Sequence, residues 1–531
     1  MTAEAELQLQ GAISFIADRV AGGVALTRRD VEALKRQAAR TFSLDRYVSN
    51  REILAALPSS AKPAFIEMLR VHPRRSASGI VVVTAFTRPL PCPHGTCVFC
   101  PGGPRLGTPQ SYLIDSPGMR SALAVKFDPF EQVKLCLAKY EANGHETEKV
   151  ETVIEGGTFV ADPADYRLSF VKGVYEGLNG FRSQSLEDAQ AANESARRRC
   201  VGLTLETKPD WCRPEEVDTM LTYGVTRLEL GVQSLHDPTL ARSNRGHTAD
   251  DAAKAFQTAR DAGLKITAHM MPGLPGATPP EDLEDFRRLF EDEAFRPDMT
   301  KIYPTLVVEG TALERLQKAG AYQPYSLETV VELLSDVKGF IPTWHRVMRV
   351  QREIPAREIS GGVKSGNLRE LVLAKAREKG RPCQCIRCRE VSLAEPESLG
   401  EEDSLRFREE QYDASGGVEV FGSYEYERSG RIAGFVRLRI PSEAAHRREL
   451  RSAGVVRELR VYGRVVRLGL RQKNAWQHRG LGASMLQSVE RTTREAFGQS
   501  RILVTSAVGT RGYYRRLGYR RLGPYMAKQL D

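Results

Sequence analysis

The segment PCPHGTCVFCPGG, residues 91–103, contains three cysteines, Cys92, Cys97 and Cys100, and is the most informative stretch of the chain. Three thiolates can hold three corners of a four-iron cluster and leave the fourth iron free for a small ligand. A structural zinc site would need a fourth Cys or His close by, but the next cysteine, Cys136, lies far downstream, and the histidine within the segment is the one local substitute. The spacing therefore favours a redox cluster over zinc.

Short apolar runs alternate with helical stretches through residues 79–350. The predicted strands are 80–84, 150–154, 202–206, 227–232 and 265–269. Repeated alternation of this kind predicts parallel strands in a barrel or partial barrel. In such folds chemistry collects at the C-terminal ends of the strands.

Polar residues stand at these predicted strand ends. They are Glu155-Gly156-Gly157-Thr158, Glu206, Glu229, Gln233, His269, Lys301 and Tyr303. Gly156 and Gly157 would let backbone groups approach a ligand, although a plain turn after a strand has the same glycines. A single polar residue in this position is more often a satisfied core group, but several that converge on one rim predict a site.

The composition is that of an ordinary globular protein. The 531 residues suffice for two to four domains, with 41% hydrophobic and 27% charged residues. A polar N-terminus and the lack of a long uncharged apolar run predict a cytoplasmic protein without membrane contact. The formal charge of +10 favours a polyanionic partner, and the excess lies in residues 443–531, which hold 19 Lys and Arg against 6 Asp and Glu.

The N-terminal segment, residues 1–78, is predicted to be helical because apolar residues recur at helical spacing in 31–40 and 52–57. Its basic residues could form an RNA-facing surface, or they could simply be the solvated face of a helix. They are Arg28, Arg29, Lys35, Arg36, Arg40, Arg70, Arg74 and Arg75.

A second group of thiols, Cys383, Cys385 and Cys388, lies in a polar connector that spans residues 351–400. Three thiols in six residues suit a tetrahedral structural zinc whose fourth ligand is unassigned, and a second iron–sulfur site is the alternative. The charged run 401–410 that follows is interpreted as a surface segment.

The last segment, residues 401–531, contains short predicted strands followed by a glycine-rich turn and an amphipathic helix at 484–497. The turn reads Gln477-His478-Arg479-Gly480-Leu481-Gly482-Ala483. A glycine turn that opens a helix presents unpaired N–H groups and a positive dipole end, which suit a pyrophosphate. Its position after strands and before a helix resembles the acyl-CoA loop of the GNAT acetyltransferases. Tyr513 and Tyr514 lie where that family often has a tyrosine near the thioester, although two core tyrosines are the alternative.

The cysteine segment is similar to that of the radical S-adenosylmethionine (SAM) enzymes, in which an aromatic residue such as Phe99 precedes the last cysteine. The commonest spacing in that superfamily has three residues in the first gap, and this chain has four. Taken whole, the chain resembles the catalytic subunit of Elongator in its single-chain archaeal or bacterial form, a family that accepts the longer gap. The matching segments are 43–46, 49–50, 92–103, 155–158, 206–210, 230–234, 361–369 and 523–526.

This resemblance implies an α/β protein in which a partial (β/α) radical SAM barrel is joined through a zinc-binding linker to a GNAT acetyltransferase domain. It also implies modification of the wobble uridine of tRNA. A reduced [4Fe-4S] cluster on the three cysteines of residues 91–103 would cleave SAM to a 5′-deoxyadenosyl radical, which takes hydrogen from the methyl group of acetyl-CoA. The carbon radical would add to uridine C5, and thioester hydrolysis would leave a carboxymethyl group.

The resemblance also implies roles for particular residues. Gly156 and Gly157 would contact SAM, and Lys301 and Tyr303 would lie at the mouth of the active site. Gln477, Arg479, Gly480, Leu481, Gly482 and Ala483 would hold CoA, with Tyr513 or Tyr514 at its acyl end. The N-terminal basic residues, together with Arg447, Arg448 and Arg451, would contact tRNA phosphates while an unstacked anticodon base enters the barrel. The oligomeric state is left open, a homodimer included.

Two other functions are compatible with parts of the sequence. A protein lysine acetyltransferase with a purely structural iron–sulfur domain would use a carboxylate base, for which Glu458 is the candidate. A non-catalytic RNA-binding scaffold would need no oxygen-sensitive cluster, and it is the least favoured of the three.

Overall fold

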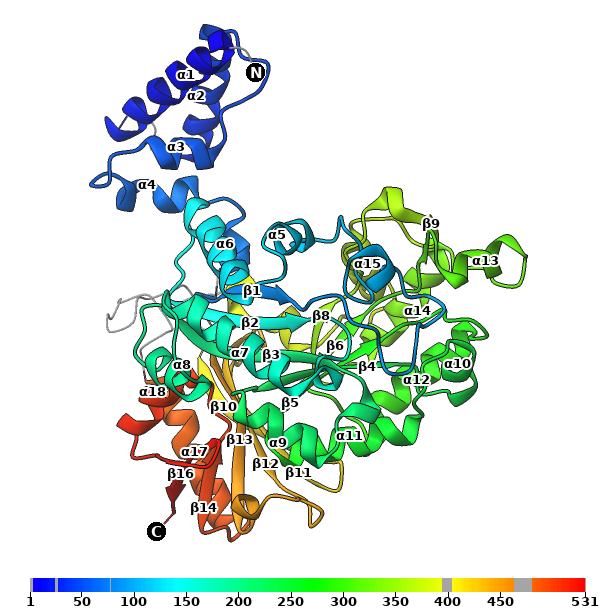
Figure 1. The fold of residues 1–531 in the computed structure, drawn as a ribbon. Helices are drawn as coiled ribbons and strands as arrows, with labels where there is room; N and C mark the ends of the chain where they lie inside the picture. Colours follow the sequence, from blue (N-terminus) through cyan, green and yellow to red (C-terminus); the bar gives the residue numbers. More distant parts are fainter. Residues whose placement is uncertain (1–2, 24–26, 77, 394–403, 463–479, 531) are drawn as a thin grey trace.

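The computed structural model describes residues 3–530 apart from 24–26, 77, 394–403 and 463–479. Figure 1 shows a small helical body at one end, a central barrel and a C-terminal sheet domain beneath it. The helical body consists of α1 (Ala3–Ala21), α2 (Arg28–Thr41), α3 (Asn50–Ala56) and α4 (Lys62–Leu69). Capping boxes at Thr27 and Ser49 start α2 and α3, and both helices bury apolar residues, as the helical spacing predicts.

The central sheet has seven strands, and every pair of neighbours in it is parallel. Its strands in spatial order are β1 (Val81–Phe86), β2 (Lys149–Glu155), β3 (Arg199–Thr207), β4 (Arg227–Gln233), β5 (Lys265–Met270), β6 (Met299–Ile302) and β8 (Arg346–Arg349). The order follows the chain, and β1 and β8 stand at the two edges. The predicted partial barrel is therefore confirmed.

Helices cover the outer face of this sheet (Figure 1). The helices of this part of the chain are α5 (Met119–Ala124), α6 (Pro129–Ala142), α7 (Ala164–Asn179), α8 (Leu186–Asn193), α9 (Pro214–Thr222), α10 (Asp237–Arg242), α11 (Ala249–Asp261), α12 (Pro279–Glu291), α13 (Ala312–Lys318), α14 (Leu327–Gly339) and α15 (Leu368–Glu378). Among them, α13 packs against the short strand β7 and α15 packs against α14. A two-stranded ribbon pairs β7 (Val307–Val308) with β9 (Ile359–Gly361). None of the helices in the described ranges has the length and apolar composition that a membrane crossing requires.

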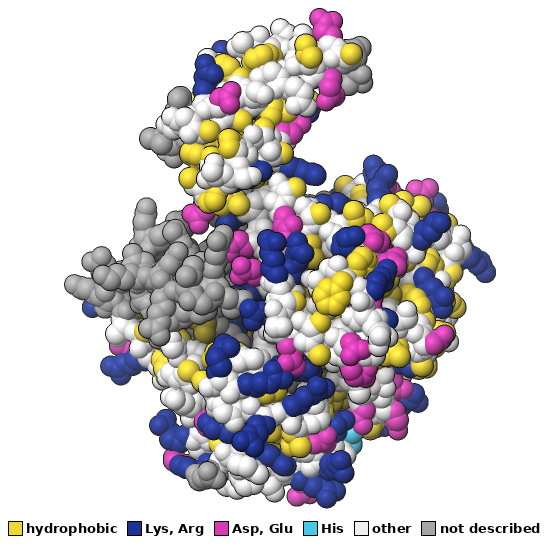
Figure 2. Space-filling view, turned by 60° about the vertical axis from the view of Figure 1, so that its left-hand side comes forward, with side chains coloured by type: hydrophobic (Ala, Val, Ile, Leu, Met, Phe, Trp, Pro, Cys, Tyr) yellow, Lys and Arg dark blue, Asp and Glu magenta, His cyan; other side chains and the backbone are white. Residues whose placement is uncertain are grey.

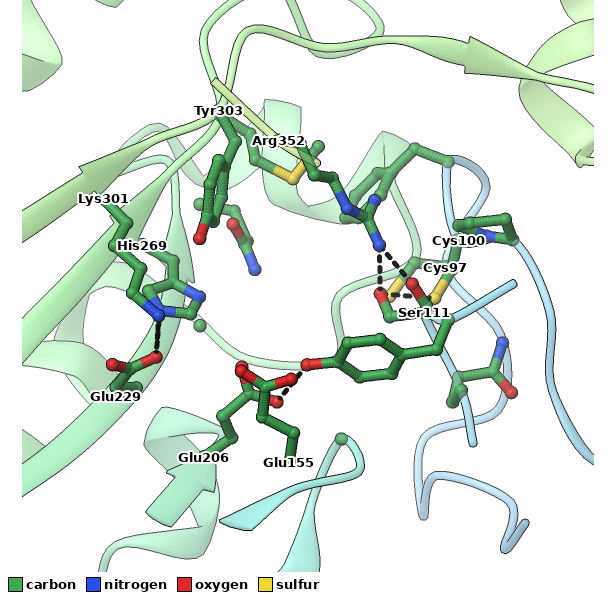
Figure 3. A pocket seen from close by; sticks show the side chains of 18 of the residues that line it. Cys97, Cys100, Ser111, Glu155, Glu206, Glu229, His269, Lys301, Tyr303 and Arg352 are labelled. Atoms are coloured by element: carbon green, nitrogen blue, oxygen red, sulfur yellow. Dashed lines mark hydrogen bonds and ion pairs between the residues drawn. The ribbon is translucent and has the colours of Figure 1, made fainter. Parts of the chain in front are cut away.

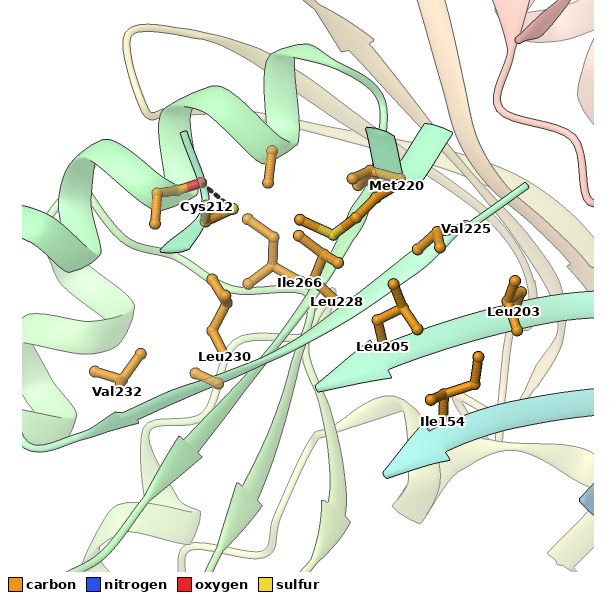
Figure 4. Close-up of a cluster of buried hydrophobic side chains, with 14 of the residues drawn as sticks. Ile154, Leu203, Leu205, Cys212, Met220, Val225, Leu228, Leu230, Val232 and Ile266 are labelled. Carbon is orange, nitrogen blue, oxygen red and sulfur yellow. Dashed lines mark hydrogen bonds between the residues drawn. The ribbon is translucent and has the colours of Figure 1, made fainter. Parts of the chain in front are cut away.

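The core of the barrel is made by apolar side chains from its parallel strands and from the helices outside them. Figure 4 shows Leu205, Leu228 and Ile266 on adjacent strands packed with Met220 from α9, and all of these side chains are buried. Strands buried on both faces read as nearly continuous apolar runs, which is why the sequence revealed them. This packing fixes the strand ends that carry the polar residues.

The C-terminal domain is a second seven-stranded sheet, antiparallel except for the β13–β14 pair. Its strands in spatial order are β10 (Leu405–Ala414), β11 (Gly417–Tyr426), β12 (Ile432–Ile440), β13 (Ala453–Val461), β14 (Arg501–Val504), β16 (Tyr525–Gln529) and β15 (Arg520–Leu522). Its helices are α17 (Leu481–Glu495) and α18 (Arg511–Arg516), and the short α16 (Ile386–Arg389) lies in the connector. In the charged run 401–410, residues 401–403 lie outside the described residues, and 404–410 are exposed apart from the half-buried Leu405 and Phe407. The part from residue 405 onward is the edge strand β10.

The two sheets meet through buried ion pairs at the N-terminal ends of the barrel strands. Arg457 of β13 donates two hydrogen bonds to Asp298, at 2.6 and 2.7 Å, just before β6 begins. Arg439 of β12 pairs with Asp261 at 2.6 Å at the end of α11. Because both arginines are fully buried, these pairs hold the sheet domain rigidly against the barrel, at the end opposite to the polar strand ends.

Candidate active site

The three cysteines lie in a long loop after β1, at the C-terminal end of the barrel (Figure 3). Cys97 and Cys100 are buried, and Cys92 is half-buried. The loop is closed by a glycine turn, because a Cβ on Gly102 would lie 1.9 Å from the carbonyl oxygen of Tyr112. Glycine is therefore required where the loop doubles back on itself.

Each of the two buried thiols has a hydrogen-bond partner. Cys97 Sγ lies 3.1 Å from Arg245 Nη1 and 3.1 Å from His94 Nε2. Cys100 Sγ lies 3.1 Å from Ser111 Oγ, and Arg352 holds that serine in turn. Sequence reasoning missed Arg245, Ser111 and Arg352, since none of them stands in a recognisable metal motif.

The spacing of these thiols fits a multi-iron cluster better than a single ion. In the described part of the chain two groups have all their ligand atoms within 4.8 Å of one another: Cys383 with Cys385 and Cys388, and Glu206 with Glu229 and His269. The sulfur atoms of Cys92, Cys97 and Cys100 do not all lie within 4.8 Å of one another. Three separated thiols around one opening are the donor set that a four-iron cluster needs.

Gly156 and Gly157 follow β2 and lie against the cysteine loop. A Cβ on Gly156 would lie 1.8 Å from Thr87 Oγ1, and one on Gly157 would lie 3.3 Å from Cys92 Sγ. Gly157 also has a φ of 84°, which side chains rarely adopt. The backbone of this turn therefore runs beside the first thiol, where a ligand of the cluster would reach it.

Lys301 belongs to a buried ion cluster on the floor of the same cavity. Its Nζ donates to Glu229 Oε2, which also lies 3.1 Å from His269 Nε2 (Figure 3). Burial by itself would raise the pKa of Glu229, but the neighbouring Lys301 ammonium outweighs burial and holds that pKa well below its usual value. Tyr303 packs edge-on against His269, with ring centroids 5.4 Å apart, and its pKa is raised by burial. Lys301 is thus held by its counter-ion Glu229 in the buried part of the cavity, whereas the sequence predicts a position at the cavity mouth.

Two further carboxyl groups, Glu155 and Glu206, face each other beside this cluster (Figure 3). Burial and the Glu155 carboxylate raise the pKa of Glu206 to about 7, and burial raises that of Glu155. The Tyr112 hydroxyl donates to Glu206 Oε2 at 2.9 Å. A carboxyl that titrates near neutral pH can accept or release a proton during catalysis.

These groups share one cavity of about 220 Å³ at the C-terminal ends of the barrel strands. The three thiols line one wall, and the acidic groups with Lys301 and Tyr303 line another. The sequence prediction that polar strand ends converge on one rim is therefore confirmed.

The second thiol group is compact and buried in the connector. Cys385 Sγ and Cys388 Sγ lie 3.7 Å apart, and Cys385 caps the short helix α16. The nearby His345 is not available as a fourth ligand, since its two ring nitrogens bond to Thr300 Oγ1 at 2.9 Å and to the carbonyl oxygen of Pro297 at 2.8 Å. The donor set fits a single thiophilic ion such as zinc.

In the C-terminal domain, Gly480, Leu481, Gly482 and Ala483 form the cap and first turn of α17. A Cβ on Gly482 would lie 2.9 Å from the Tyr513 hydroxyl, so this tyrosine faces the helix start. Tyr514 is buried in the domain core, where it packs edge-on against Tyr513 and Tyr519. Gln477 and Arg479 lie outside the described residues.

Glu458, the base expected for a lysine acetyltransferase, lies in the interface between the two sheets. It is buried and pairs with Arg437 at 3.2 Å. A carboxylate held there by a buried arginine cannot reach a lysine of another protein, so the structure does not support that function.

The predicted nucleic-acid residues fall into two groups. Arg28, Arg29, Arg36, Arg40, Arg75 and Arg448 are exposed. Lys35 is only 8% exposed and pairs with Glu32. Arg447 is half-buried and pairs with Asp218 and Glu449. For these two residues the expectation of free phosphate contacts is therefore corrected. The side chain of Arg74 lies outside the described residues. Figure 2 shows further Lys and Arg side chains over the lower part of the visible face, where the C-terminal domain lies.

Comparison with known families matches most of the chain. The model of the radical SAM superfamily matches residues 92–290, and that of the radical SAM C-terminal domain matches 297–378. The ELP3 N-terminal domain matches residues 9–77, and the acetyltransferase (GNAT) domain matches 423–529.

Curated relatives align over nearly their whole length. The tRNA uridine(34) acetyltransferase of Methanocaldococcus jannaschii is 41% identical over 528 residues, which cover 98% of this chain and 97% of that protein. Elongator complex protein 3 of Homo sapiens is 40% identical over 510 residues, which cover 94% of this chain and 93% of that protein. A solved structure of Methanocaldococcus infernus Elp3 with an N-terminal deletion (1–46) is 40% identical and superimposes with a TM-score of 0.74 over 85% of this chain and 100% of that one.

Proposed function

This chain belongs to the family of Elongator complex protein 3 and the archaeal tRNA uridine(34) acetyltransferases, and from that membership we propose that it attaches a carboxymethyl precursor to C5 of the wobble uridine in tRNA. The observation that carries the proposal is that three separated thiols open into the same cavity as a buried lysine and titratable carboxyls. A domain of an acyl-CoA-dependent family is fixed to the same barrel.

Cys92, Cys97 and Cys100 would hold a [4Fe-4S] cluster, and the backbone of Gly156 and Gly157 would receive SAM beside Cys92. When bound, this pair of cofactors supplies a 5′-deoxyadenosyl radical that takes hydrogen from the acetyl methyl group. Enclosure of the reacting groups within this cavity would limit the access of water to them. Lys301 and Tyr303 present polar atoms to the base that enters, and Glu206 can hold or accept a proton there.

In the C-terminal domain the first-turn N–H groups of α17, at Leu481, Gly482 and Ala483, would bind the phosphates of acetyl-CoA together with Gln477 and Arg479. Tyr513 faces this turn and would lie at the acyl end, whereas Tyr514, which is buried in the domain core, would have a packing role. Cys383, Cys385 and Cys388 would hold a structural zinc ion, and the exposed N-terminal arginines with Arg448 would contact tRNA phosphates.

The test is anaerobic incubation of the reconstituted protein with SAM, acetyl-CoA, a reductant and tRNA, followed by nucleoside mass spectrometry. We expect 5-carboxymethyluridine with the wild type and none with Cys100→Ser. Cys136→Ser, which alters a half-buried thiol outside the loop, is the matched control and should retain activity. Product formation by Cys100→Ser at the wild-type rate would refute the proposal.

A further inference from the structure

A buried arginine reaches the cysteine loop from the middle of the barrel. Arg245 follows α10 and is 6% exposed. Its Nη1 donates to Cys97 Sγ at 3.1 Å, and its Nη2 donates to the carbonyl oxygen of Gly231 at 2.7 Å. A Cβ on Gly231 would lie 3.0 Å from that Nη2, so a glycine in β4 makes room for the guanidinium. The arginine is therefore held between a barrel strand and a thiol.

The charge of Arg245 has no carboxylate counter-ion. Within the described ranges no Asp or Glu forms an ion pair with it, and its Nε has no hydrogen-bond partner. The neighbouring Lys208 is paired with Asp210 at 3.2 Å. A buried, unpaired arginine is costly, and the site is therefore built to receive an anion.

The group that Arg245 contacts is a ligand of the expected cluster, the thiol of Cys97 at 3.1 Å. Ligation of iron requires thiolates, and a four-iron cluster on three thiolates carries net negative charge that grows when the cluster is reduced. Loading the cluster would thus supply the missing counter-ion, at the sulfur that Arg245 already contacts.

We propose that Arg245 is the counter-ion of the cluster, and that through Cys97 it anchors the cluster and favours its reduced form. The inference rests on the proposed function, because it takes a [4Fe-4S] cluster at the three thiols as given. Cys100 Sγ donates to the neutral hydroxyl of Ser111, which Arg352 contacts in turn, so the direct contact of a guanidinium with a thiol is the one between Arg245 and Cys97 among the hydrogen bonds of the described residues. Arg245 is a positioning residue, since it contacts a ligand and not the substrate. Charge and hydrogen bonds at cluster sulfurs are known determinants of reduction potential.

The test measures the midpoint potential of the reconstituted cluster by EPR-monitored redox titration, without SAM or tRNA. The variants are Arg245→Gln, which removes the charge, and Arg245→Lys, which keeps it. Arg242→Gln, at an exposed arginine of α10, is the control. For Arg245→Gln we expect the reduced-to-oxidised ratio at fixed potential to fall at least about tenfold, which is about 59 mV for a one-electron couple. Arg245→Lys should shift less than half as far, and Arg242→Gln should match the wild type.

Iron and sulfide content, measured on the same samples, separates the possible outcomes. Failure of Arg245→Gln to load a cluster that Arg245→Lys does load supports the proposal, because Lys keeps the positive charge that Gln removes. Equal loss of the cluster in both variants, or full loading of Arg245→Gln with an unchanged potential, overturns it. A wild type that binds no cluster refutes the proposed function itself.

Discussion

Replacing Glu206 by Gln should stabilise the folded protein at alkaline pH. Burial and the adjacent Glu155 carboxylate raise the pKa of Glu206 from 4.5 to about 7. The same carboxyl in the unfolded chain titrates at about 4.3, so its ionisation opposes folding as soon as the pH exceeds that value. The opposition grows until the pH passes the folded pKa. At about 1.4 kcal/mol per pH unit it reaches about 3.6 kcal/mol at pH 8, and it is close to zero at pH 4.

Gln is nearly isosteric with Glu, can still accept the Tyr112 hydrogen bond and carries no charge at any pH. The opposition grows by about 2 kcal/mol between pH 5.5 and pH 8.5. Scanning calorimetry at these two pH values should therefore show that the variant gains about 4 °C in Tm over the wild type from the lower to the higher pH, at roughly 2 °C per kcal/mol for a domain of this size. Glu284→Gln, on the exposed face of α12, is the control and should show no such pH dependence. A Tm difference between Glu206→Gln and the wild type that is the same at both pH values would refute the reasoning.

Two further predictions concern the C-terminal domain. Asp298→Asn leaves the buried Arg457 without its full counter-ion, so the free energy of unfolding should fall by about 3 kcal/mol or more, measured as a drop in Tm. An unchanged Tm would contradict the prediction and show that Glu419, which Arg457 also contacts at 2.6 Å, suffices as its counter-ion. Gly482→Ala places a methyl group 2.9 Å from the Tyr513 hydroxyl and should weaken acetyl-CoA binding at least about tenfold by calorimetric titration, which is about 1.4 kcal/mol. Gly512→Ala, with open space around the added methyl group, should bind like the wild type.

Much of the fold could be predicted because its strands are buried on both faces. The runs that became β1 to β5 are apolar and β-branched, and their polar ends marked the cavity. The edge strand β10 was interpreted only as a surface segment, because its Glu and Arg side chains are depleted in strands and it is held by backbone pairing with β11. Propensity carries no information about such pairing.

The residues of the candidate site likewise divide into those that the sequence revealed and those that only the structure shows. Cysteine spacing and strand ends revealed the thiols, Lys301 and Glu206, because those signals are local in the sequence. Arg245 could not be predicted, since its contact with Cys97 joins residues 148 positions apart. For the same reason the burial of Lys35 and the interface position of Glu458 emerged only from the packing of distant elements.

The contact between the start of α18 and the start of β3 bears on the distance between the expected coenzyme site and the cavity. Gly509 packs directly on Arg199, and Arg511 pairs with Glu194 at 3.2 Å, so the tyrosine that faces α17 sits near the first residue of that strand. Glu206 stands near the last residue of the same strand, a separation of about 20 Å at about 3.3 Å per residue. On the proposed function, a coenzyme docked at α17 and a nucleobase in the cavity would therefore lie near opposite ends of one strand, β3. The acetyl group would then have to cross that distance between coenzyme binding and reaction, as a step whose rate can be measured separately from either binding event.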